Sequence, residues 1–172
     1  MTHPISDVFN PEFDLCFERI VDVPPEKIWA AWTTPDLLLK WFCPLPWRTV
    51  ACEIDLKPGG QFNTVMQSPE GQEFPSSGCF LEIVPNQKLV WTNAFLPGFR
   101  PAKLPEDDGS CGSFAFTGII SLSPHPQGTR YQAVVLHADK AGRDQHAAMG
   151  FEEGWGKALD QMIAMIKSNP CF

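Results

Sequence analysis

One stretch decides how this chain folds: VPPEKIWAAWTTPDLLLKWF, residues 23–42. A proline in the first turn of a helix costs no hydrogen bond, and an acidic side chain there favours the positive end of the helix dipole. Pro25 and Glu26 therefore predict a short helix over residues 25–31. Thr34, Pro35 and Asp36 then end that helix and start another. We expect two short consecutive helices near the start of the chain.

Extended segments surround these helices. Residues 13–21 alternate with a period of two, so we expect a strand whose odd positions point inward. Residues 47–56 are also expected to be extended, followed by a turn at 57–60. The next strand is predicted to carry Phe62, Thr64 and Met66 on one face. Three further strands are predicted over residues 78–84, 113–122 and 129–138. Between the first and second of these, another strand is predicted to carry Leu89, Trp91, Asn93 and Phe95 on one face.

The chain is predicted to end in one helix over residues 143–167. Its apolar stripe recurs every three or four residues and consists of Phe151, Trp155, Leu159, Met162 and Ile166. Gly150, Gly154 and Gly156 each cost about 1 kcal/mol relative to alanine inside a helix. A close approach by a neighbouring element would offset that cost, and a ligand surface is the alternative. Before this helix, the Pro- and Gly-rich segment 96–112 is predicted to be a long loop, either a gate or an insertion.

The order of these elements and four sequence motifs resemble one known family. The motifs are the opening stretch at 23–42, DLKPGG at 55–60, GCFLEIVP at 78–85 and GFEEGW at 150–155. Together they resemble the Bet v 1-like (START-type, or SRPBCC) superfamily, and within it the bacterial family named after the C-terminal domain of the activator of Hsp90 ATPase. The resemblance spans roughly Phe13 to Ile166. It implies an α+β helix-grip fold, in which a curved antiparallel sheet wraps a long C-terminal helix and two short helices follow the first strand.

Composition limits the classes of partner. The 172 residues are expected to form a single domain, with an ordered core from about 13 to 167. A formal charge of -7 disfavours a nucleic-acid surface. We found no apolar run of the roughly 20 residues that a membrane helix needs, and expect a cytoplasmic protein, monomeric or homodimeric. The six cysteines are scattered, so free thiols are favoured over disulfides or metal ligands.

Aromatic side chains are the main candidates for ligand binding. The chain has six tryptophans and thirteen phenylalanines but one tyrosine. Large apolar rings around a helix-grip cavity would bind apolar or aromatic small molecules, although the same rings could simply fill the core. The candidate ligand-binding residues are Trp29, Trp32, Trp41, Phe62, Trp91, Phe116, Phe151 and Trp155. Trp29, Trp32 and Trp41 are expected to form one wall, with Trp155 opposite them.

The candidates for catalysis are three titratable residues, Glu53, Asp55 and His137. His137, at the end of a strand, and His146, early in the last helix, are expected near one mouth of the cavity. Their spacing does not predict a metal site, because no third ligand is placed by the sequence. Glu53 and Asp55 share one strand face and would form an acid/base pair if buried. Exposure, or pairing with Arg48 or Lys57, is the alternative. We expect no metal and no cofactor.

These features support three hypotheses about function. The first is binding of a small hydrophobic or aromatic molecule between the sheet and the last helix. The second is an enzyme acting on a polyketide-like substrate, a cyclase, dehydratase or hydrolase in which Glu53, Asp55 or His137 moves protons. The third, regulation of the Hsp90 chaperone, rests on the family name alone.

Overall fold

The computed structural model describes residues 8–104, 106, 113–169 and 171. Its strands are β1 (Leu15–Val21), β2 (Arg48–Ile54), β3 (Gln61–Gln67), β4 (Glu73–Val84), β5 (Lys88–Thr92), β6 (Phe95–Leu96), β7 (Arg100–Pro101), β8 (Phe116–His125) and β9 (Gly128–His137). Its helices are α1 (Pro25–Thr33), α2 (Pro35–Leu38), α3 (Lys140–Ala148) and α4 (Phe151–Ser168).

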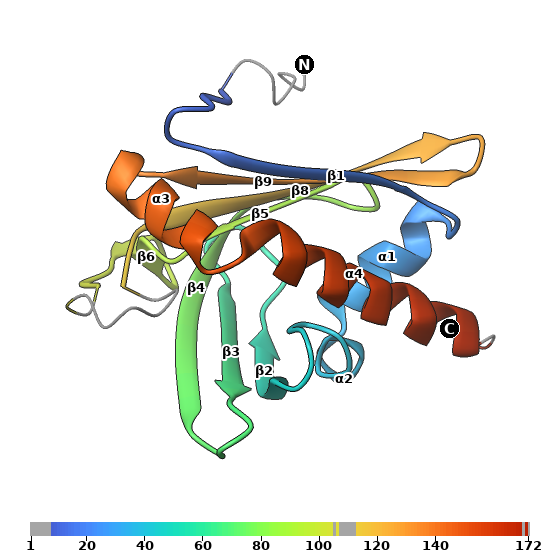
Figure 1. Cartoon of the computed structure of the whole chain (residues 1–172), viewed down its shortest axis with the longest axis horizontal. Helices are drawn as coiled ribbons and strands as arrows, with labels where there is room; N and C mark the ends of the chain where they lie inside the picture. The colour runs from blue at the N-terminus through green and yellow to red at the C-terminus, as the bar shows by residue number, and fades with distance from the viewer. Residues whose placement is uncertain (1–7, 105, 107–112, 170, 172) are drawn as a thin grey trace.

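Seven of the strands form one antiparallel sheet in the order β1-β9-β8-β5-β4-β3-β2. In Figure 1, β4, β3 and β2 run at a steep angle to β1, β9 and β8, so the sheet bends around α4, which crosses its concave side. The helices α1 and α2 lie beside the C-terminal half of α4 (Figure 1). This is the helix-grip α+β arrangement that the resemblance implied.

The two short helices begin where the prolines predicted. α1 starts at Pro25 and α2 at Pro35, each with an acidic residue in its first turn. α1 continues to Thr33, two residues beyond the prediction, and buries Ile28, Ala31 and Trp32. The helices therefore place an indole ring in the core rather than only closing one end of the fold.

A β-bulge changes the face assignment in β2. The sequence predicted that Thr49, Ala51 and Glu53 share one face, but the register with β3 shifts between Thr49 and Ala51. An extra residue in one strand reverses the side on which the preceding side chains lie. Thr49 is consequently 6% exposed, while Ala51 and Glu53 are exposed.

Other strand boundaries also move. β4 begins at Glu73 rather than at residue 78, because its first half pairs with β3 down to the turn between them. The strands β8 and β9 continue to a tight turn, with His125 opposite Gly128. Phe95 belongs to the separate β6–β7 hairpin and does not continue the face of β5. Part of the predicted loop 96–112, namely 105 and 107–112, lies outside the described residues.

The prediction of a single last helix was wrong, because Gly150 divides it. Gly150 has a φ of 82°, a left-handed conformation that glycine adopts without steric cost, and it separates α3 from α4. A Cβ added at Gly150 would touch no described atom within 4 Å. Gly150 therefore turns the chain and does not form a packing patch with Gly154. The preceding helix α3 begins at Lys140 and is capped by Asp139, whose carboxylate accepts a hydrogen bond from the Gly142 amide at 2.8 Å.

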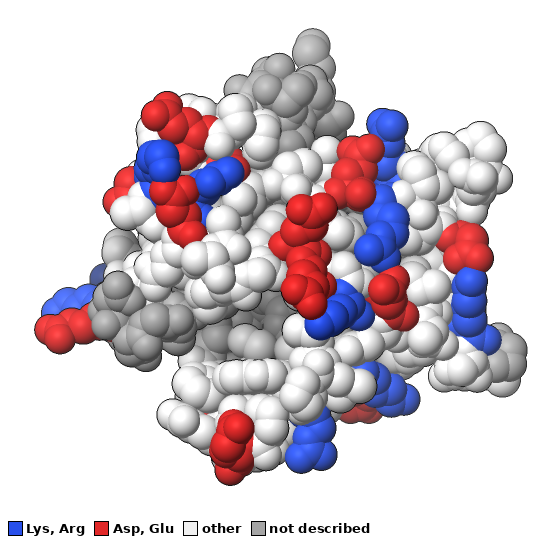
Figure 2. Space-filling view, viewed as in Figure 1, with Lys and Arg blue, Asp and Glu red and all other residues white. Residues whose placement is uncertain are grey.

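The two faces of the sheet have different partners. The face toward α4 carries most of the core, whereas the opposite face buries a small cluster of Val90, Ile119 and Val134 beneath Phe9. Acidic and basic side chains alternate over the face of the molecule that carries α4, with no single-sign patch (Figure 2). Among the described residues, no helix has both the length and the apolar character needed to span a bilayer.

Candidate ligand site beneath the last helix

Six aromatic rings pack against one another at the centre of the fold. We call this set the central aromatic cluster; its members are Trp32, Trp41, Phe42, Phe62, Phe80 and Trp91. Neighbouring rings have centroids 4.9 to 5.8 Å apart, mostly edge to face. That geometry is the favourable one for aromatic pairs. The candidate residues Trp32, Trp41, Phe62 and Trp91 therefore lie together and bury one another.

The sheet packs closely against one ring of this cluster. A Cβ added at Gly118 of β8 would lie 2.7 Å from the indole ring of Trp91. Only a residue without a side chain allows that ring to lie flat on the strand. The Trp41 indole N–H is also satisfied, because it donates to the Ala31 carbonyl at 3.0 Å.

A second group of rings lies at the other end of α4 and contains two histidines. We call it the histidine cluster; its members are Phe114, Phe116, His137, His146 and Phe151. It is built at the junctions of four elements: the start of β8, the end of β9, α3 and the first residue of α4. His137, His146 and Phe116 are only partly buried.

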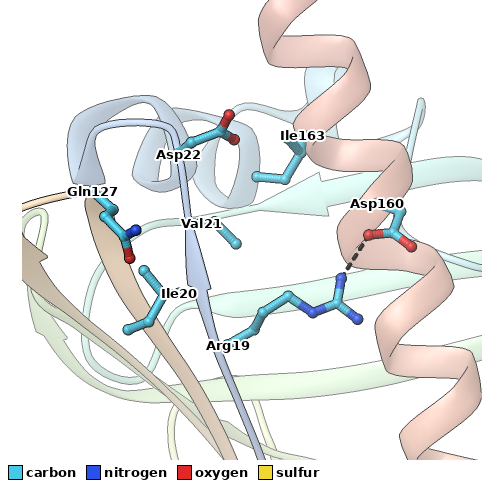
Figure 3. A pocket seen from close by; sticks show the side chains of 7 residues that line it. All are labelled: Arg19, Ile20, Val21, Asp22, Gln127, Asp160 and Ile163. Carbon is cyan, nitrogen blue, oxygen red and sulfur yellow. Dashed lines mark hydrogen bonds and ion pairs between the residues drawn. The ribbon is translucent and has the colours of Figure 1, made fainter.

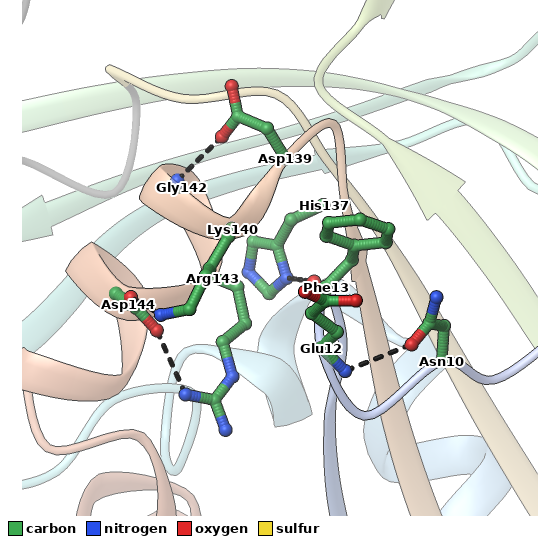
Figure 4. Close-up of polar contacts among 9 residues, drawn as sticks. All are labelled: Asn10, Glu12, Phe13, His137, Asp139, Lys140, Gly142, Arg143 and Asp144. Carbon is green, nitrogen blue, oxygen red and sulfur yellow. Dashed lines mark hydrogen bonds and ion pairs between the residues drawn. The ribbon is translucent and has the colours of Figure 1, made fainter.

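The two histidine side chains are hydrogen-bonded to each other. His137 Nε2 lies 3.0 Å from His146 Nδ1, and His137 Nδ1 lies 2.9 Å from the carbonyl of Phe13. Figure 4 shows His137 reaching that carbonyl from β9, with Arg143 of α3 alongside. Burial lowers the pKa of His137, and burial followed by the neighbouring His137 lowers the pKa of His146 to about 4. Both side chains are therefore neutral at pH 7.

Tyr131 joins the two clusters. Its side chain is fully buried on the inner face of β9, and its hydroxyl accepts a hydrogen bond from Trp155 Nε1 at 3.1 Å. Trp155 contacts Phe151 of the histidine cluster, with centroids 5.3 Å apart. Burial raises the pKa of Tyr131, while the indoles of Trp155 and Trp32 oppose that rise. Trp32 of the central aromatic cluster and Trp155, which contacts the histidine cluster, thus both approach the Tyr131 hydroxyl.

Two donors at this point lack an acceptor. Trp32 Nε1 is buried and has no hydrogen-bond partner among the described residues, although it lies close enough to the Tyr131 hydroxyl to lower the pKa of Tyr131. The Tyr131 O–H proton has no acceptor among the described residues either, since the hydroxyl itself accepts from Trp155. An otherwise apolar layer therefore contains two adjacent buried donors that no described oxygen satisfies.

A hollow of about 310 Å³ opens at the surface outside this point. It lies between β1 and α4, and its lining residues are Arg19, Ile20, Val21, Asp22, Gln127, Asp160 and Ile163 (Figure 3). Arg19 Nη1 bonds to Asp160 Oδ1 across it at 2.6 Å. Arg19 is the cross-strand partner of Tyr131, so the hollow opens next to the strand position of the unsatisfied hydroxyl.

A second hollow, of about 240 Å³, lies between β2 and the segment 39–47. The Gln161 amide of α4 holds this segment: it donates to the Cys43 carbonyl at 2.8 Å and accepts from the Leu45 amide at 2.9 Å. Trp41 is the one member of the candidate ligand-binding set in the lining of this hollow. Neither hollow lies within the aromatic layer itself.

The remaining candidates lie elsewhere. Asp55 pairs with Lys57 at 2.8 Å, one of the arrangements expected from the sequence, and Glu53 is exposed on β2. Of the three catalytic candidates, His137 is the one beside the aromatic rings. Trp29 is partly buried and packs against the edge of the core. Among the described residues, no three His, Cys, Asp or Glu side chains come together as a metal site.

This geometry can be compared with known proteins. The family model described as Activator of Hsp90 ATPase homolog 1-like protein matches residues 22–167. The chain belongs to the Activator of Hsp90 ATPase homolog 1-like family. No match was found in a comparison with the curated proteins.

Solved structures agree with membership of the Activator of Hsp90 ATPase homolog 1-like family. A protein from Nitrosomonas europaea is 41% identical, with a TM-score of 0.87 over 95% of this chain and 100% of its own. A protein from Rhodobacter sphaeroides is 25% identical, with a TM-score of 0.77 over 93% of this chain and 97% of its own. An AHSA1-like protein from Aeromonas hydrophila, 20% identical, shares the fold with a TM-score of 0.64, over 90% of this chain and 92% of its own.

Within this Activator of Hsp90 ATPase homolog 1-like fold, sequence reasoning missed several site residues. Tyr131, Phe42, Phe80 and Phe114 were not named as candidates, although each contributes to the layer beneath α4. A usable signal existed for Tyr131: the single tyrosine of the chain stands at an inward position of an apolar strand. A buried phenol needs a hydrogen-bond partner, so its position marks where polar groups must gather.

Proposed function

We propose that this protein binds a small apolar or aromatic molecule carrying an oxygen acceptor, in the layer between the sheet and α4. The observation that supports the proposal is the pair of buried donors without acceptors, Trp32 Nε1 and the Tyr131 hydroxyl. A buried donor left unpaired costs about 1 to 3 kcal/mol. One carbonyl, ether or hydroxyl oxygen has two lone pairs and would satisfy both donors at once.

Apolar walls and one polar anchor are the usual composition of a small-molecule site. The rings of Trp32, Trp91 and Trp155 would supply the walls, and the Tyr131 hydroxyl would fix the orientation of the ligand. Because the layer is filled, a ligand has to displace a side chain. Trp155 is the best candidate, since it is partly exposed and is flanked in α4 by Gly154 and Gly156.

The proposed route of entry is the hollow between β1 and α4. Two ion pairs hold these elements together there, Arg19 with Asp160 and Lys167 with Asp22, the latter at 2.6 Å. Their side chains are 39 to 70% exposed, so solvent screens both ion pairs and each contributes little to stability. Opening this edge therefore costs little compared with opening the buried core.

A cytoplasmic location is part of the proposal. The five cysteines among the described residues are all free, which fits a reducing compartment. The nature of the partner, a small hydrophobic molecule, follows from the apolar walls.

The test uses two probes of nearly equal shape, 9-fluorenone and fluorene, which differ by one carbonyl oxygen. Calorimetric titration should show fluorenone binding roughly ten-fold more tightly, the value of one to two neutral hydrogen bonds. Tyr131→Phe keeps the ring and removes the hydroxyl, and Trp32→Phe replaces the indole with a smaller ring that has no donor, so both should reduce this preference. Trp47→Phe, on a 37% exposed ring outside the layer, is the matched control. Failure of both probes to bind at millimolar concentration would refute the proposal.

A further inference from the structure

We propose that the His137–His146 pair builds a hydrogen-bond-accepting site at His146 Nε2, for the hydroxyl of a phenol or enol. The inference rests on the proposed function, because the ligand would occupy the same layer beneath α4. It concerns the opposite end of that layer, however, and a different atom of the ligand: a donor rather than an acceptor.

The direction of the hydrogen bonds follows from one carbonyl. The Phe13 oxygen can only accept, so His137 Nδ1 carries a proton and donates to it at 2.9 Å. In a neutral imidazole the other nitrogen is then unprotonated, so His137 Nε2 accepts from His146 Nδ1–H at 3.0 Å. By the same rule His146 Nε2 has a free lone pair. The Phe13 carbonyl therefore determines which nitrogens of both rings carry a proton, and it leaves a lone pair on His146 Nε2.

Three phenylalanine rings lie near the His146 ring. The His146 ring lies 5.2 Å from Phe114, 6.3 Å from Phe116 and 5.1 Å from Phe151, measured between centroids. No described residue donates to His146 Nε2. A flat aromatic molecule would pack against these rings while its hydroxyl donates to the lone pair.

Burial keeps the acceptor neutral, although two nearby carboxylates oppose its effect on the pKa of His137. His137 faces Asp14 of the segment before β1, Asp139 at the start of α3, and Arg143 of α3. His146 faces His137. Desolvation is the largest effect on both and lowers both pKa values, so near pH 7 the lone pair is available. An anionic carboxylate or phosphate would be repelled by that lone pair, which selects a neutral hydroxyl donor.

Calorimetry with 2-naphthol and 2-methoxynaphthalene at pH 7.5 tests the site. These probes share a ring system, but the methoxy compound has no proton to donate. We expect 2-naphthol to bind about ten-fold more tightly to the native protein, and this preference to disappear in His146→Phe. His125→Phe, in the turn between β8 and β9, is the matched control and should leave the preference unchanged.

Nitrogen-15 NMR of the histidine rings keeps the test independent of whether His146→Phe folds. In the native protein His146 should be protonated at Nδ1 and unprotonated at Nε2, and the Nε2 resonance should shift when 2-naphthol is added. A proton on Nε2, or equal affinity for the two naphthalenes, would overturn the inference. If fluorenone binds while neither naphthalene does, the inference fails and the proposed function stands; if none of the four probes binds, both fail.

Discussion

The central aromatic cluster and the histidine cluster are both built from rings beneath α4, yet they are held differently. In the central cluster the rings come from α1, from the segment after α2 and from the strands β3, β4 and β5, and the cluster has no ionisable group. In the histidine cluster the rings come from the ends of elements, and two of them titrate. Because the central cluster is closely packed, its stability depends on the shapes of its side chains. The stability of the histidine cluster also depends on the protonation of its histidines.

The two clusters differ in how they can adapt to a ligand. Dense packing penalises any change of volume, so the central cluster tolerates a ligand only if a ring moves. A partly exposed, hydrogen-bonded pair can exchange partners without creating a void. Tyr131 lies between the two and has features of both: it is fully buried, yet no described residue accepts its proton.

Removing one ring from each cluster should give the largest difference. Trp32→Ala should lower the free energy of unfolding by about 4 kcal/mol, because it leaves a cavity among rings that cannot collapse. Phe116→Ala, at a partly exposed position, should cost roughly half as much. Urea unfolding measures both values, provided that the free energy of unfolding depends on urea concentration with the same slope in each variant. Equal losses would show that the histidine cluster is packed as tightly as the central one.

Acidification should separate the clusters next. The folded pKa of His146 is about 4 and its ordinary value is 6.5, so between these pH values the unfolded chain binds more protons than the folded one. Stability should therefore be constant above about pH 6.5 and fall toward pH 4, by at most about 3 kcal/mol.

His146→Phe should flatten this pH dependence when urea midpoints are compared from pH 4 to 8. The remaining slope would come from His137, whose pKa is lowered in the same direction, and from the carboxylates. His125→Phe is again the control. An unchanged slope in His146→Phe would mean that the histidine cluster does not govern the acid response.

The smallest effect concerns one methyl group in each cluster. Gly118→Ala places a Cβ 2.7 Å from the Trp91 ring and should cost about 1 to 3 kcal/mol. Gly142→Ala, in α3 beside the histidine cluster, meets Asp139 Oδ1 at 3.5 Å and the Cβ of Phe114 at 3.6 Å, which are ordinary contacts. It should be neutral or stabilise by about 0.5 kcal/mol through helix propensity. Thermal unfolding of both variants measures these changes. An unchanged melting temperature in Gly118→Ala would contradict close packing in the central cluster.

Some parts of the site were predictable from local pattern. Trp32 and Trp91 stand at inward positions of a helix and a strand, so their place in the core followed from periodicity. The proximity of His137 and His146 was also expected, since one ends β9 and the other lies in the helix that follows. The hydrogen bond between them was not expected, because it depends on ring orientations that packing sets.

Other features had no local signal. Thr49 turned inward because a bulge shifted the register with β3, and a register is a property of two strands, not of one. Gly150 was assigned to a helix interior, whereas it divides α3 from α4 with a left-handed φ of 82°. Its sequence context allowed either role, since glycine both weakens and ends helices.

The sequence by itself determined most of the elements, their order and the family, because prolines, glycines and apolar periodicity act over a few residues. Only the tertiary structure decided that the aromatic side chains divide into two clusters, that Tyr131 joins them, and that two buried donors there lack an acceptor. Hydrogen bonds between side chains more than twenty positions apart, such as Trp155 with Tyr131, exist only after the sheet has curved around α4. No local pattern contains that information.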